Sequence, residues 1–212
     1  MIKTNVYLYQ YENITLDVQD FFSNYRLDKL STLRSKNIQT EYIVKISLEH
    51  FLDKKVDKLK FKTTENGKPI IDIENIYLNI SHSNDYLAVV ISTNEVAVDL
   101  ELINIRHLKI AKKITNDFDK LDINDVTKMW TIKESYLKYF GMSILSNLKE
   151  ITFDTNFVFG PKGNLNYQTK RYQDYYLTIT LKDNSNISYY CLKDLKSVDE
   201  FNIINKSFEE EE

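Results

Sequence analysis

The residues best suited to chemistry gather in four short segments of the chain. The segments are Gly67–Pro69, Asn79–Ser83, Val98–Glu101 and Trp130–Lys138. Together they supply three carboxylates, a histidine and several lysines. Carboxylate oxygens are ligands that Mg²⁺ prefers, and phosphate oxygens and water commonly complete its coordination. The four segments therefore indicate a magnesium site that holds a phosphorylated ligand.

Two of the carboxylates, Asp99 and Glu101, are two residues apart in a segment predicted to be a β-strand. Side chains at that spacing project from the same face of a strand. The apolar neighbours Val98, Leu100 and Leu102 then point the other way, into a core. Two adjacent carboxylates repel each other unless a positive charge lies between them. Taken alone, the pair favours an exposed polar strand face over a metal site.

The third carboxylate, Glu134, belongs to a predicted helix, in which Trp130 and Lys138 each lie four residues away from it. Glu134 and Lys138 also have the spacing of a helix-surface ion pair, worth ~0.2–0.5 kcal/mol. Such a pair leaves the neighbouring Trp130 unexplained. We therefore expect Glu134 to complete the metal site and Lys138 to reach a phosphate oxygen.

The segment Ser81-His82-Ser83 comes at the end of a predicted strand. A hydrolase would use a serine as nucleophile and His82 as its base, but adjacent side chains of an extended chain point in opposite directions. We interpret His82 as a phosphate contact or as a structural histidine. Lys68 and Pro69 follow a glycine turn, where they either line a ligand pocket or only form the turn.

The pattern of apolar and turn residues predicts strands alternating with helices. Strands are expected at Val6–Tyr9, in a hairpin within Phe61–Ile71, and at Tyr77–Ile80, Tyr86–Ser92, Val96–Ile103, Glu150–Phe153, Tyr175–Leu181 and Ile187–Leu192. Helices are expected at Ile38–Leu52, Leu108–Ile114 and Asp122–Phe140, with an irregular, partly helical stretch at Leu16–Ser35. The helix that carries Glu134 has Asp122 as its expected N-cap and Gly141 in the C′ position.

These elements follow a similar order in the two halves of the chain. We therefore predict an α+β fold built as a pseudo-twofold pair of similar lobes, each a small antiparallel sheet packed with helices. The N-terminal lobe is expected at residues 1–94 and the C-terminal lobe at residues 95–208, followed by an acidic, disordered tail at residues 209–212. A ligand commonly binds in the cleft between two such lobes.

The composition excludes several classes of function. The net charge of −3 argues against general nucleic-acid binding, which needs a basic excess. No segment approaches the ~20 apolar residues of a membrane span, and the first residues do not resemble a signal peptide. The single cysteine, Cys191, excludes an intramolecular disulfide and is expected to be a buried thiol. We expect a cytoplasmic protein with no nucleic-acid or membrane partner.

The four segments, in this order, resemble the motifs of the 4′-phosphopantetheinyl transferases of the surfactin-synthetase-activating type. That family carries Gly-Lys-Pro, (Phe/Asn)-x-Ser-His-Ser, Gly-x-Asp-x-Glu and Trp-x-x-Lys-Glu-(Ala/Ser)-x-x-x-Lys, the last being the most specific. The matching region covers about a third of the chain. The resemblance implies a monomeric, magnesium-dependent enzyme. It would transfer the phosphopantetheine group of coenzyme A to a serine of an acyl or peptidyl carrier protein, releasing 3′,5′-ADP.

The resemblance also implies a role for each matching residue. Asp99, Glu101 and Glu134 would bind magnesium, and Glu134 would also be the general base toward the carrier serine. Lys138 would contact the pyrophosphate of coenzyme A, and His82 its 3′-phosphate.

The remaining contacts with coenzyme A would come from further residues of the same segments and of the N-terminal half. The adenine would be bordered by Lys68, Pro69 and Ser81. Lys133 would orient either the helix or the phosphates. Arg34 and Lys36 are candidates for the 3′-phosphate, and Lys29 is a weaker one.

Two features depart from the family pattern or leave it open. Ala97 stands where the strand motif usually has glycine. An additional acidic residue near the carrier is usual after the strand, and Asp117, Asp119 and Asp122 are equally placed for it. Two other functions remain as alternatives: a non-catalytic family member that binds coenzyme A or a carrier protein, and an unrelated α+β binding protein with a solvated acidic strand.

Overall fold

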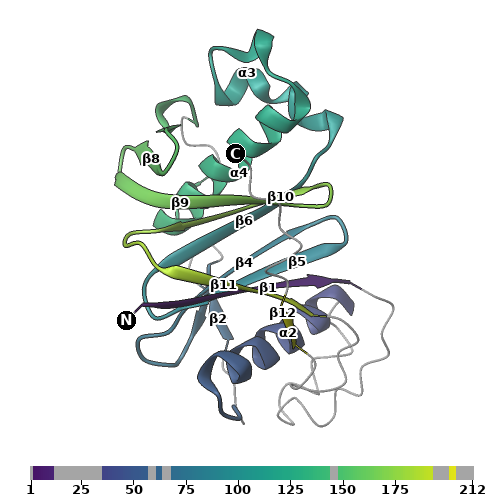
Figure 1. The fold of residues 1–212 in the computed structure, drawn as a ribbon, viewed down its shortest axis with the longest axis vertical. Coiled ribbons are helices and arrows are strands. Elements are labelled where there is room, and N and C mark those ends of the chain that lie inside the picture. The colour runs from purple at the N-terminus through teal and green to yellow at the C-terminus, as the bar shows by residue number, and fades with distance from the viewer. Residues whose placement is uncertain are drawn as a thin grey trace.

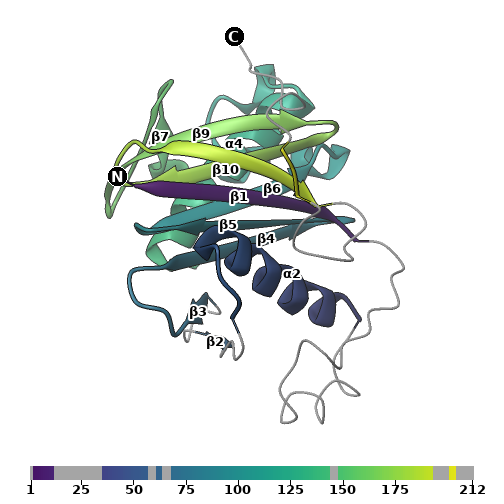
Figure 2. The same cartoon turned by 60° about the horizontal axis from the view of Figure 1, so that its bottom comes forward.

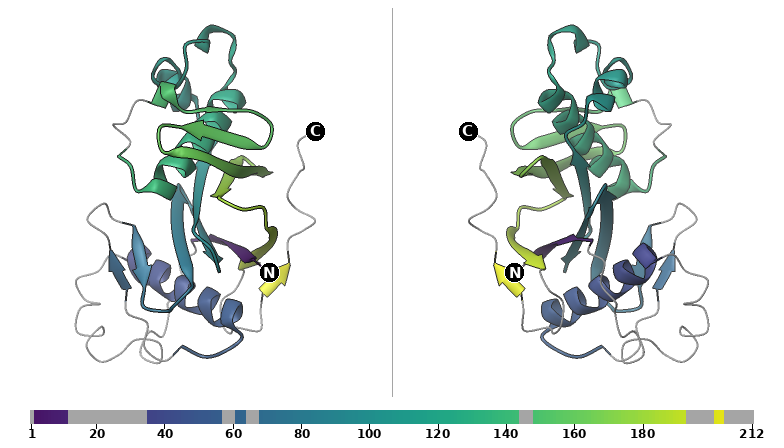
Figure 3. Two further views of the ribbon diagram at one scale, coloured as in Figure 1. Left: turned by 90° about the vertical axis from the view of Figure 1, so that its left-hand side faces the viewer. Right: turned by 90° about the vertical axis from the view of Figure 1, so that its right-hand side faces the viewer.

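The computed structural model describes residues 2–11, 35–56, 61–63, 68–143, 148–192 and 201–203. Two sheets pack face to face, helix α2 (Ser35–Leu52) covers the outer face of the first sheet, and helix α4 (Ile123–Phe140) covers the outer face of the second (Figures 1 and 2). Figure 3 shows the two helices at opposite ends of this stack. The two helices cover the outer faces of the sheets and not their edges, so an edge strand of one sheet can contact an edge strand of the other.

The first sheet has the strand order β12-β11-β1-β5-β4. Its strands are β1 (Lys3–Gln10), β4 (Tyr77–Ser83), β5 (Tyr86–Ser92), β11 (Asn186–Leu192) and β12 (Phe201–Ile203). Strand β1 pairs with β11 in parallel and with β5 in antiparallel orientation. A strand from the end of the chain therefore lies beside its first strand.

The second sheet is antiparallel and has the order β6-β10-β9-β8-β7. Its strands are β6 (Val96–Leu102), β7 (Thr152–Phe153), β8 (Phe157–Gly160), β9 (Gly163–Tyr172) and β10 (Tyr175–Leu181). A separate two-stranded hairpin joins β2 (Phe61–Thr63) to β3 (Pro69–Ile71). Strand β6 is thus an edge of the second sheet, as β4 is of the first.

The central strands are buried on both faces because alternate residues serve different cores. In β1, Val6 and Leu8 pack between the two sheets, whereas Tyr7 and Tyr9 pack against the layer of α2. In β6, Val98 and Leu100 enter the core between the sheets, and Ala97 faces the layer of α4. Asp99 and Glu101 share the Ala97 face by the same alternation, so they are directed toward α4.

Helix α4 is fixed at both ends by its sequence. The Asp122 side chain accepts a hydrogen bond from Asp125 N–H, and the Asp125 carboxylate accepts one from Asp122 N–H, which forms a capping box. At the other end Gly141 takes the left-handed conformation, with φ 61°. Ile132 and Tyr136 are fully buried against the second sheet. The apolar side of α4 therefore sets which residues turn toward β6.

The predicted α+β class is confirmed, as are α4 with its two caps, α2, the hairpin and the strands around β1, β4, β5, β6, β10 and β11. Cys191 is a buried free thiol, as expected. The pseudo-twofold relation and the boundary between residues 94 and 95 remain predictions. The pairing of β11 with β1 bears on that boundary, because it places a strand of the expected C-terminal lobe in the first sheet. Residues 16–34 and the acidic tail lie outside the described residues.

Two predicted elements differ in the structure. The helix expected at Leu108–Ile114 is instead a 3₁₀ helix, η1 (Ile105–Lys109), followed by the short α3 (Ala111–Ile114). The Asn104 side chain caps η1 at Arg106 N–H, which starts the turn earlier than predicted. The strand expected at Glu150–Phe153 is a 3₁₀ turn, η3 (Leu148–Glu150), followed by the two-residue β7.

Strands β8 and β9 were not predicted. Strand β9 has few apolar residues, because much of it is only partly buried at the outer end of the second sheet. A strand of this kind lacks the apolar alternation by which strands are recognised. None of the helices that the structure describes is long and apolar enough to cross a membrane.

Candidate active site

The edge strands β4 and β6 belong to different sheets but are joined by side chains. Three alternate residues of β4 accept hydrogen bonds from three alternate backbone N–H groups of β6. The pairs are Asn79 Oδ1 with Val98 N–H at 3.0 Å, Ser81 Oγ with Leu100 N–H at 3.1 Å, and Ser83 Oγ with Leu102 N–H at 3.0 Å. We call this set of six residues the seam. It satisfies backbone donors that an edge strand would otherwise leave unpaired.

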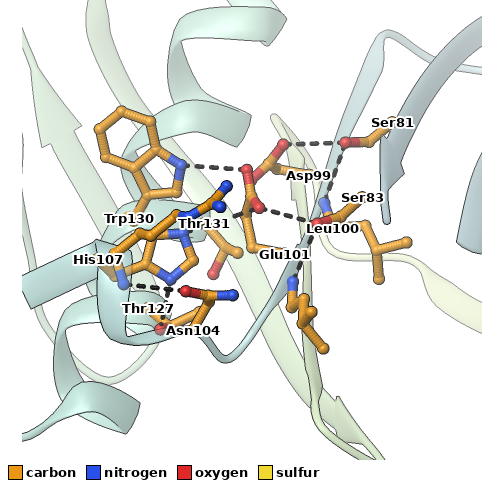
Figure 4. Close-up of polar contacts among 12 residues, drawn as sticks. Ser81, Ser83, Asp99, Leu100, Glu101, Asn104, His107, Thr127, Trp130 and Thr131 are labelled. Atoms are coloured by element: carbon orange, nitrogen blue, oxygen red, sulfur yellow. Dashed lines mark hydrogen bonds and ion pairs between the residues drawn. The ribbon is translucent and has the colours of Figure 1, made fainter. Parts of the chain in front are cut away.

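The two serines of the seam also bind the two carboxylates of β6. Ser81 Oγ donates to Asp99 Oδ1 at 3.0 Å, and Ser83 Oγ donates to Glu101 Oε2 at 3.0 Å (Figure 4). Each hydroxyl therefore accepts from the β6 backbone and donates to a β6 carboxylate. Because it is committed in this way, the Ser81 hydroxyl is not a free nucleophile. The Ser81 side chain is directed toward Asp99. A contact between Ser81 and adenine would therefore have to use a hydroxyl that is already bonded to Asp99.

Helix α4 presents one row of functional side chains to β6. Trp130, Glu134 and Lys138 succeed one another at four-residue spacing on one face. Trp130 Nε1 donates to Glu101 Oε1 at 3.3 Å, and Lys138 Nζ donates to Asp99 Oδ1 at 2.6 Å. The tryptophan that a surface ion pair could not explain thus binds one of the two strand carboxylates.

The carboxylates are close enough to influence one another electrostatically. Burial, together with the charge of Asp99, raises the pKa of Glu101 to about 7. Burial, again with the charge of Asp99, raises the pKa of Glu134 to about 7, although Lys138 acts in the opposite direction. Among the described residues, Asp99 Oδ2 and Glu134 Oε1 are buried oxygens without a hydrogen-bond partner. Such oxygens are costly unless a cation or donor satisfies them.

This donor set suits a hard divalent cation. Within the described part of the chain, no three or more histidine, cysteine, aspartate or glutamate side chains stand together in an arrangement that could hold a metal ion. Magnesium usually takes only one or two protein carboxylates, and phosphate oxygens and water supply the rest. The two unsatisfied oxygens and the mutual repulsion of the carboxylates therefore fit a magnesium ion. In this structure the Lys138 ammonium supplies the positive charge beside Asp99.

His107 and Thr127 also belong to the site, although no local pattern in the sequence pointed to them. Thr127 Oγ1 donates to Ile123 O at 2.7 Å, so it accepts from His107 Nδ1 at 2.9 Å. The other ring nitrogen, Nε2, faces Glu101 Oε2 at 3.8 Å. Burial lowers the pKa of His107, with Asp99 opposing the shift. Ser83 was also missed as a functional residue, although its place two residues after Ser81 on the same strand face pointed to it.

A small cavity lies beside Lys138 at the C-terminal end of α4. Its volume is ≈ 170 Å³, and its lining includes Lys68, Pro69, Asn79, Lys138 and Gly141. Ligand pockets are commonly ~300–1,000 Å³, so this cavity accommodates only part of a ligand. It brings together the predicted adenine neighbours Lys68 and Pro69 with the predicted pyrophosphate contact.

His82 lies on the opposite side of β4 from the two serines. Leu78 and Ile80, at the same alternation, pack in the core beneath α2, so His82 belongs to the α2 side, where it is exposed. Lys36 of α2 donates to Asn84 O at 3.1 Å, just beyond this strand end. The structure thus brings Lys36 toward the strand end that carries His82. Arg34 and Lys29 lie outside the described residues.

Lys133 points away from the carboxylates. It is buried, and its ammonium donates to Ile114 O at 2.5 Å and to Leu148 O at 2.9 Å. Burial lowers its pKa to about 8. Of the two roles considered for Lys133, orientation of the helix is therefore the one supported, and contact with the phosphates is not.

The three acidic candidates near the carrier are also separated from Glu134. Asp122 is committed to the capping box at the start of α4. Glu134 is twelve residues further along the helix, or about 18 Å at a rise of ~1.5 Å per residue. Asp117 and Asp119 lie in the exposed turn before Asp122. None of these three carboxylates bonds to Asp99, Glu101 or Glu134 within the described residues.

Comparison with known proteins gives a consistent result. The family model described as the 4′-phosphopantetheinyl transferase superfamily matches residues 71–190, more than half of the chain. The chain is 25% identical over 166 residues to the 4′-phosphopantetheinyl transferase gsp of Aneurinibacillus migulanus, covering 73% of this chain and 68% of that protein.

Two further relatives are similar over a shorter region. The 4′-phosphopantetheinyl transferase Sfp of Bacillus subtilis is 30% identical over 112 residues, which is 47% of this chain and 48% of that protein. The 4′-phosphopantetheinyl transferase psf-1 of Bacillus pumilus is 26% identical over 107 residues, which is 46% of each. The chain thus aligns with about half the length of these two proteins. The region matched by the family model, residues 71–190, contains Ser81, Ser83, the three carboxylates and Lys138. The resemblance inferred from the four motifs is confirmed: the chain belongs to the 4′-phosphopantetheinyl transferase superfamily.

Proposed function

We propose that this protein transfers the 4′-phosphopantetheine group of coenzyme A to a serine of a carrier protein, with magnesium, and releases 3′,5′-ADP. The observation that carries the proposal is the convergence of Asp99, Glu101 and Glu134 from two elements, with Lys138 on Asp99 and two carboxylate oxygens unsatisfied. Family membership supports the same reaction. The proposal includes a monomeric, cytoplasmic enzyme.

Asp99, Glu101 and Glu134 would hold the magnesium ion. When bound, the ion would supply positive charge to the phosphate oxygens on which negative charge develops during transfer. Trp130 and Ser83 hold Glu101 from two sides, at 3.3 and 3.0 Å. Ser81 holds Asp99 at 3.0 Å. The chain's own contribution is therefore to fix the direction of these carboxylates.

Glu134 is the proposed general base. Its raised pKa and unpartnered Oε1 make it a suitable acceptor for the hydroxyl proton of the carrier serine. The serine oxygen then bonds to the β-phosphorus, the bond from that phosphorus to the bridging oxygen breaks, and 3′,5′-ADP leaves with the electron pair. Lys138, 30% exposed, would neutralise charge on the pyrophosphate.

Coenzyme A would extend from this centre into the N-terminal half. The cavity bordered by Lys68 and Pro69 supports an adenine site there. His82 and Lys36 support a 3′-phosphate contact on the α2 side of β4. Arg34 remains a proposed contact from outside the described residues.

The surface beyond β6 supports docking of a carrier protein. Ile105 and Leu108 of η1 are exposed, at 64% and 38% of their surface. Arg106, Lys109, Lys112 and Lys113 are exposed in the same segment. An apolar and basic rim complements the acidic helix expected beside the modified serine of a carrier.

Mass spectrometry of an apo carrier protein incubated with this protein, coenzyme A and magnesium tests the reaction. We expect a mass gain equal to phosphopantetheine, which disappears with EDTA. Glu134→Gln is expected to lower the rate at least ~100-fold, and Asp99→Ala to abolish transfer, while both variants remain folded by circular dichroism. Binding of coenzyme A without transfer to fatty-acid, polyketide or peptidyl carriers would favour the non-catalytic alternative. Absence of both would overturn the proposal.

A further inference from the structure

The seam does more than join the two sheets, because two of its members reach the carboxylates of β6. Asn79 accepts from Val98 N–H at 3.0 Å, whereas Ser83 both accepts from Leu102 N–H and donates to Glu101. Side chains of β4 thus accept three backbone N–H groups of β6. Ser83 in addition links this contact to Glu101, a residue of the site.

The hydrogen bonds of Ser83 fix the direction of its single proton. A serine hydroxyl has one donor and two acceptor positions. Leu102 N–H occupies an acceptor position at 3.0 Å, and Glu101 Oε2 receives the proton at 3.0 Å. The backbone N–H therefore orients the hydroxyl, and the hydroxyl orients the carboxylate (Figure 4). Trp130 binds the other oxygen, Oε1, so the two contacts together define the plane of the carboxylate.

We propose that Ser83 is a positioning residue for Glu101, through which the strand of the first sheet sets the orientation of a metal-binding carboxylate in the second. This inference rests on the proposed function, because it assigns Glu101 to the magnesium site. Partners that orient a ligating carboxylate typically contribute 10–100-fold to metal affinity or activity. Ser83 does not touch the reacting atoms, so its effect is expected in metal binding first and in the rate as a consequence.

Binding of Mn²⁺, used as a paramagnetic probe for the magnesium site, tests this role independently of turnover. Free Mn²⁺ is measured by electron paramagnetic resonance in the presence of coenzyme A, with a correction for the coenzyme alone. Ser83→Ala should weaken Mn²⁺ binding about tenfold. Ser83→Thr retains the hydroxyl and suits a β-strand, so it should restore binding. Ser83→Cys, which keeps the size of the side chain but donates only weakly, should show a loss similar to that of Ser83→Ala.

Ser92→Ala provides a matched control. Ser92 Oγ also accepts a backbone N–H, from Asn94 at 3.2 Å, and bonds to Thr4 Oγ1 at 2.8 Å, but it lies at the opposite end of the β4–β5 pair. Its Mn²⁺ affinity should stay within about twofold of the unaltered protein, whatever happens to its thermal midpoint. Equal loss in Ser92→Ala and Ser83→Ala would show a general structural effect and overturn the proposal, as would normal binding by Ser83→Ala and Ser83→Cys.

The outcomes separate this role from the transferase function. Transfer by the unaltered protein, with normal Mn²⁺ binding by the Ser83 variants, would overturn the role of Ser83 alone. Ser83-dependent Mn²⁺ binding without transfer to any carrier would overturn the transferase proposal and leave the positioning role. No Mn²⁺ binding by the unaltered protein would overturn both.

Discussion

Charge balance at Asp99 is the central feature of the site at the scale of single residues. Asp99 is 3% exposed and bonds to the Lys138 ammonium and to the Ser81 hydroxyl. Glu101 and Glu134 both have a raised pKa because they are buried and lie near Asp99. One ammonium therefore offsets a cluster of carboxylates that a divalent cation would offset more fully.

Lys138→Met tests whether the ammonium competes with the cation for Asp99. Transfer should fall at least tenfold, since the charge toward the pyrophosphate is lost. Mn²⁺ binding without coenzyme A should instead become about fivefold tighter, equivalent to roughly 1 kcal/mol of relieved repulsion. Lys138→Arg keeps the charge and should show no such tightening. Weaker Mn²⁺ binding by Lys138→Met would contradict the competition, and the paramagnetic resonance titration measures it directly.

At the scale of elements, the position of α4 is held by hydrogen bonds of Lys133, which does not belong to the row formed by Trp130, Glu134 and Lys138. Lys133 ties the helix to the carbonyl groups of Ile114 and Leu148, on two segments that are distant in sequence. The Lys133 ammonium therefore has a structural role, on a different face of α4 from Glu134. Helix α4 thus carries both side chains of the site and Lys133, whose hydrogen bonds hold the helix in place.

Lys133→Met should destabilise the protein without affecting the ligand directly. The variant removes both hydrogen bonds, and although Leu148 O still accepts Ile151 N–H at 3.3 Å, Ile114 O loses its lysine donor. The expected cost is about 1–3 kcal/mol. Urea unfolding measures this loss, and calorimetry measures the affinity of the folded protein for coenzyme A, which should not change. A loss of affinity with unchanged stability would instead restore the phosphate contact considered for Lys133.

The C-terminal end of α2 provides a pH-dependent contribution that is remote from the site. Glu49 is 3% exposed and accepts hydrogen bonds from Lys45 and from Val56 N–H. Burial alone would raise the pKa of Glu49, but these bonds and the charges of Lys45 and Lys55 bring it below its ordinary value of 4.5. A lowered carboxyl pKa stabilises the fold above the unfolded pKa, and this stabilisation is lost as the pH falls through the folded pKa.

Glu49→Gln should therefore lower the free energy of unfolding by about 1–2 kcal/mol at pH 7. The difference between the variant and the unaltered protein should shrink as the pH falls below 4.5, because protonated Glu49 also loses its charge. Urea unfolding at pH 7 and at successive acidic values checks both points. A difference that stays constant into acid would mean that packing, not ionisation, causes the effect.

At the scale of the whole molecule, the two sheets share one core. Val6 and Leu8 of the first sheet pack with Val98 and Leu177 of the second. Strand β11 returns from near the end of the chain to pair with β1. These contacts connect the expected lobes in both directions along the chain.

The protein should therefore unfold in a single cooperative transition, despite the two-lobed division predicted at residue 94. Scanning calorimetry should give a ratio of van't Hoff to calorimetric enthalpy of about one. Strand β11 cannot leave the first sheet without exposing its paired edge, so the halves stabilise each other. Two resolved transitions would show that the halves fold independently.

The sequence alone identified the candidate site residues and predicted most of the elements near them. Asp99 and Glu101 share a strand face because the side-chain period of a strand is two, and Trp130, Glu134 and Lys138 share a helix face because helical neighbours recur at three to four residues. The caps of α4 were also readable, since Asp122 and Gly141 act within one turn of the chain. Such features depend on local geometry, which the sequence specifies directly.

Only the tertiary structure decided which partners these residues meet. The bonds from Ser83 to Glu101, Lys138 to Asp99 and His107 to Thr127 span 18, 39 and 20 residues. The pairing of β11 with β1 joins residues that are still further apart in the sequence. The seam joins strands that belong to different sheets. For residues on different elements, separation in the sequence does not indicate their distance in the folded structure. Those contacts are set by the packing of α4 and both sheets around shared cores, and the direction of every carboxylate in the site follows from that packing.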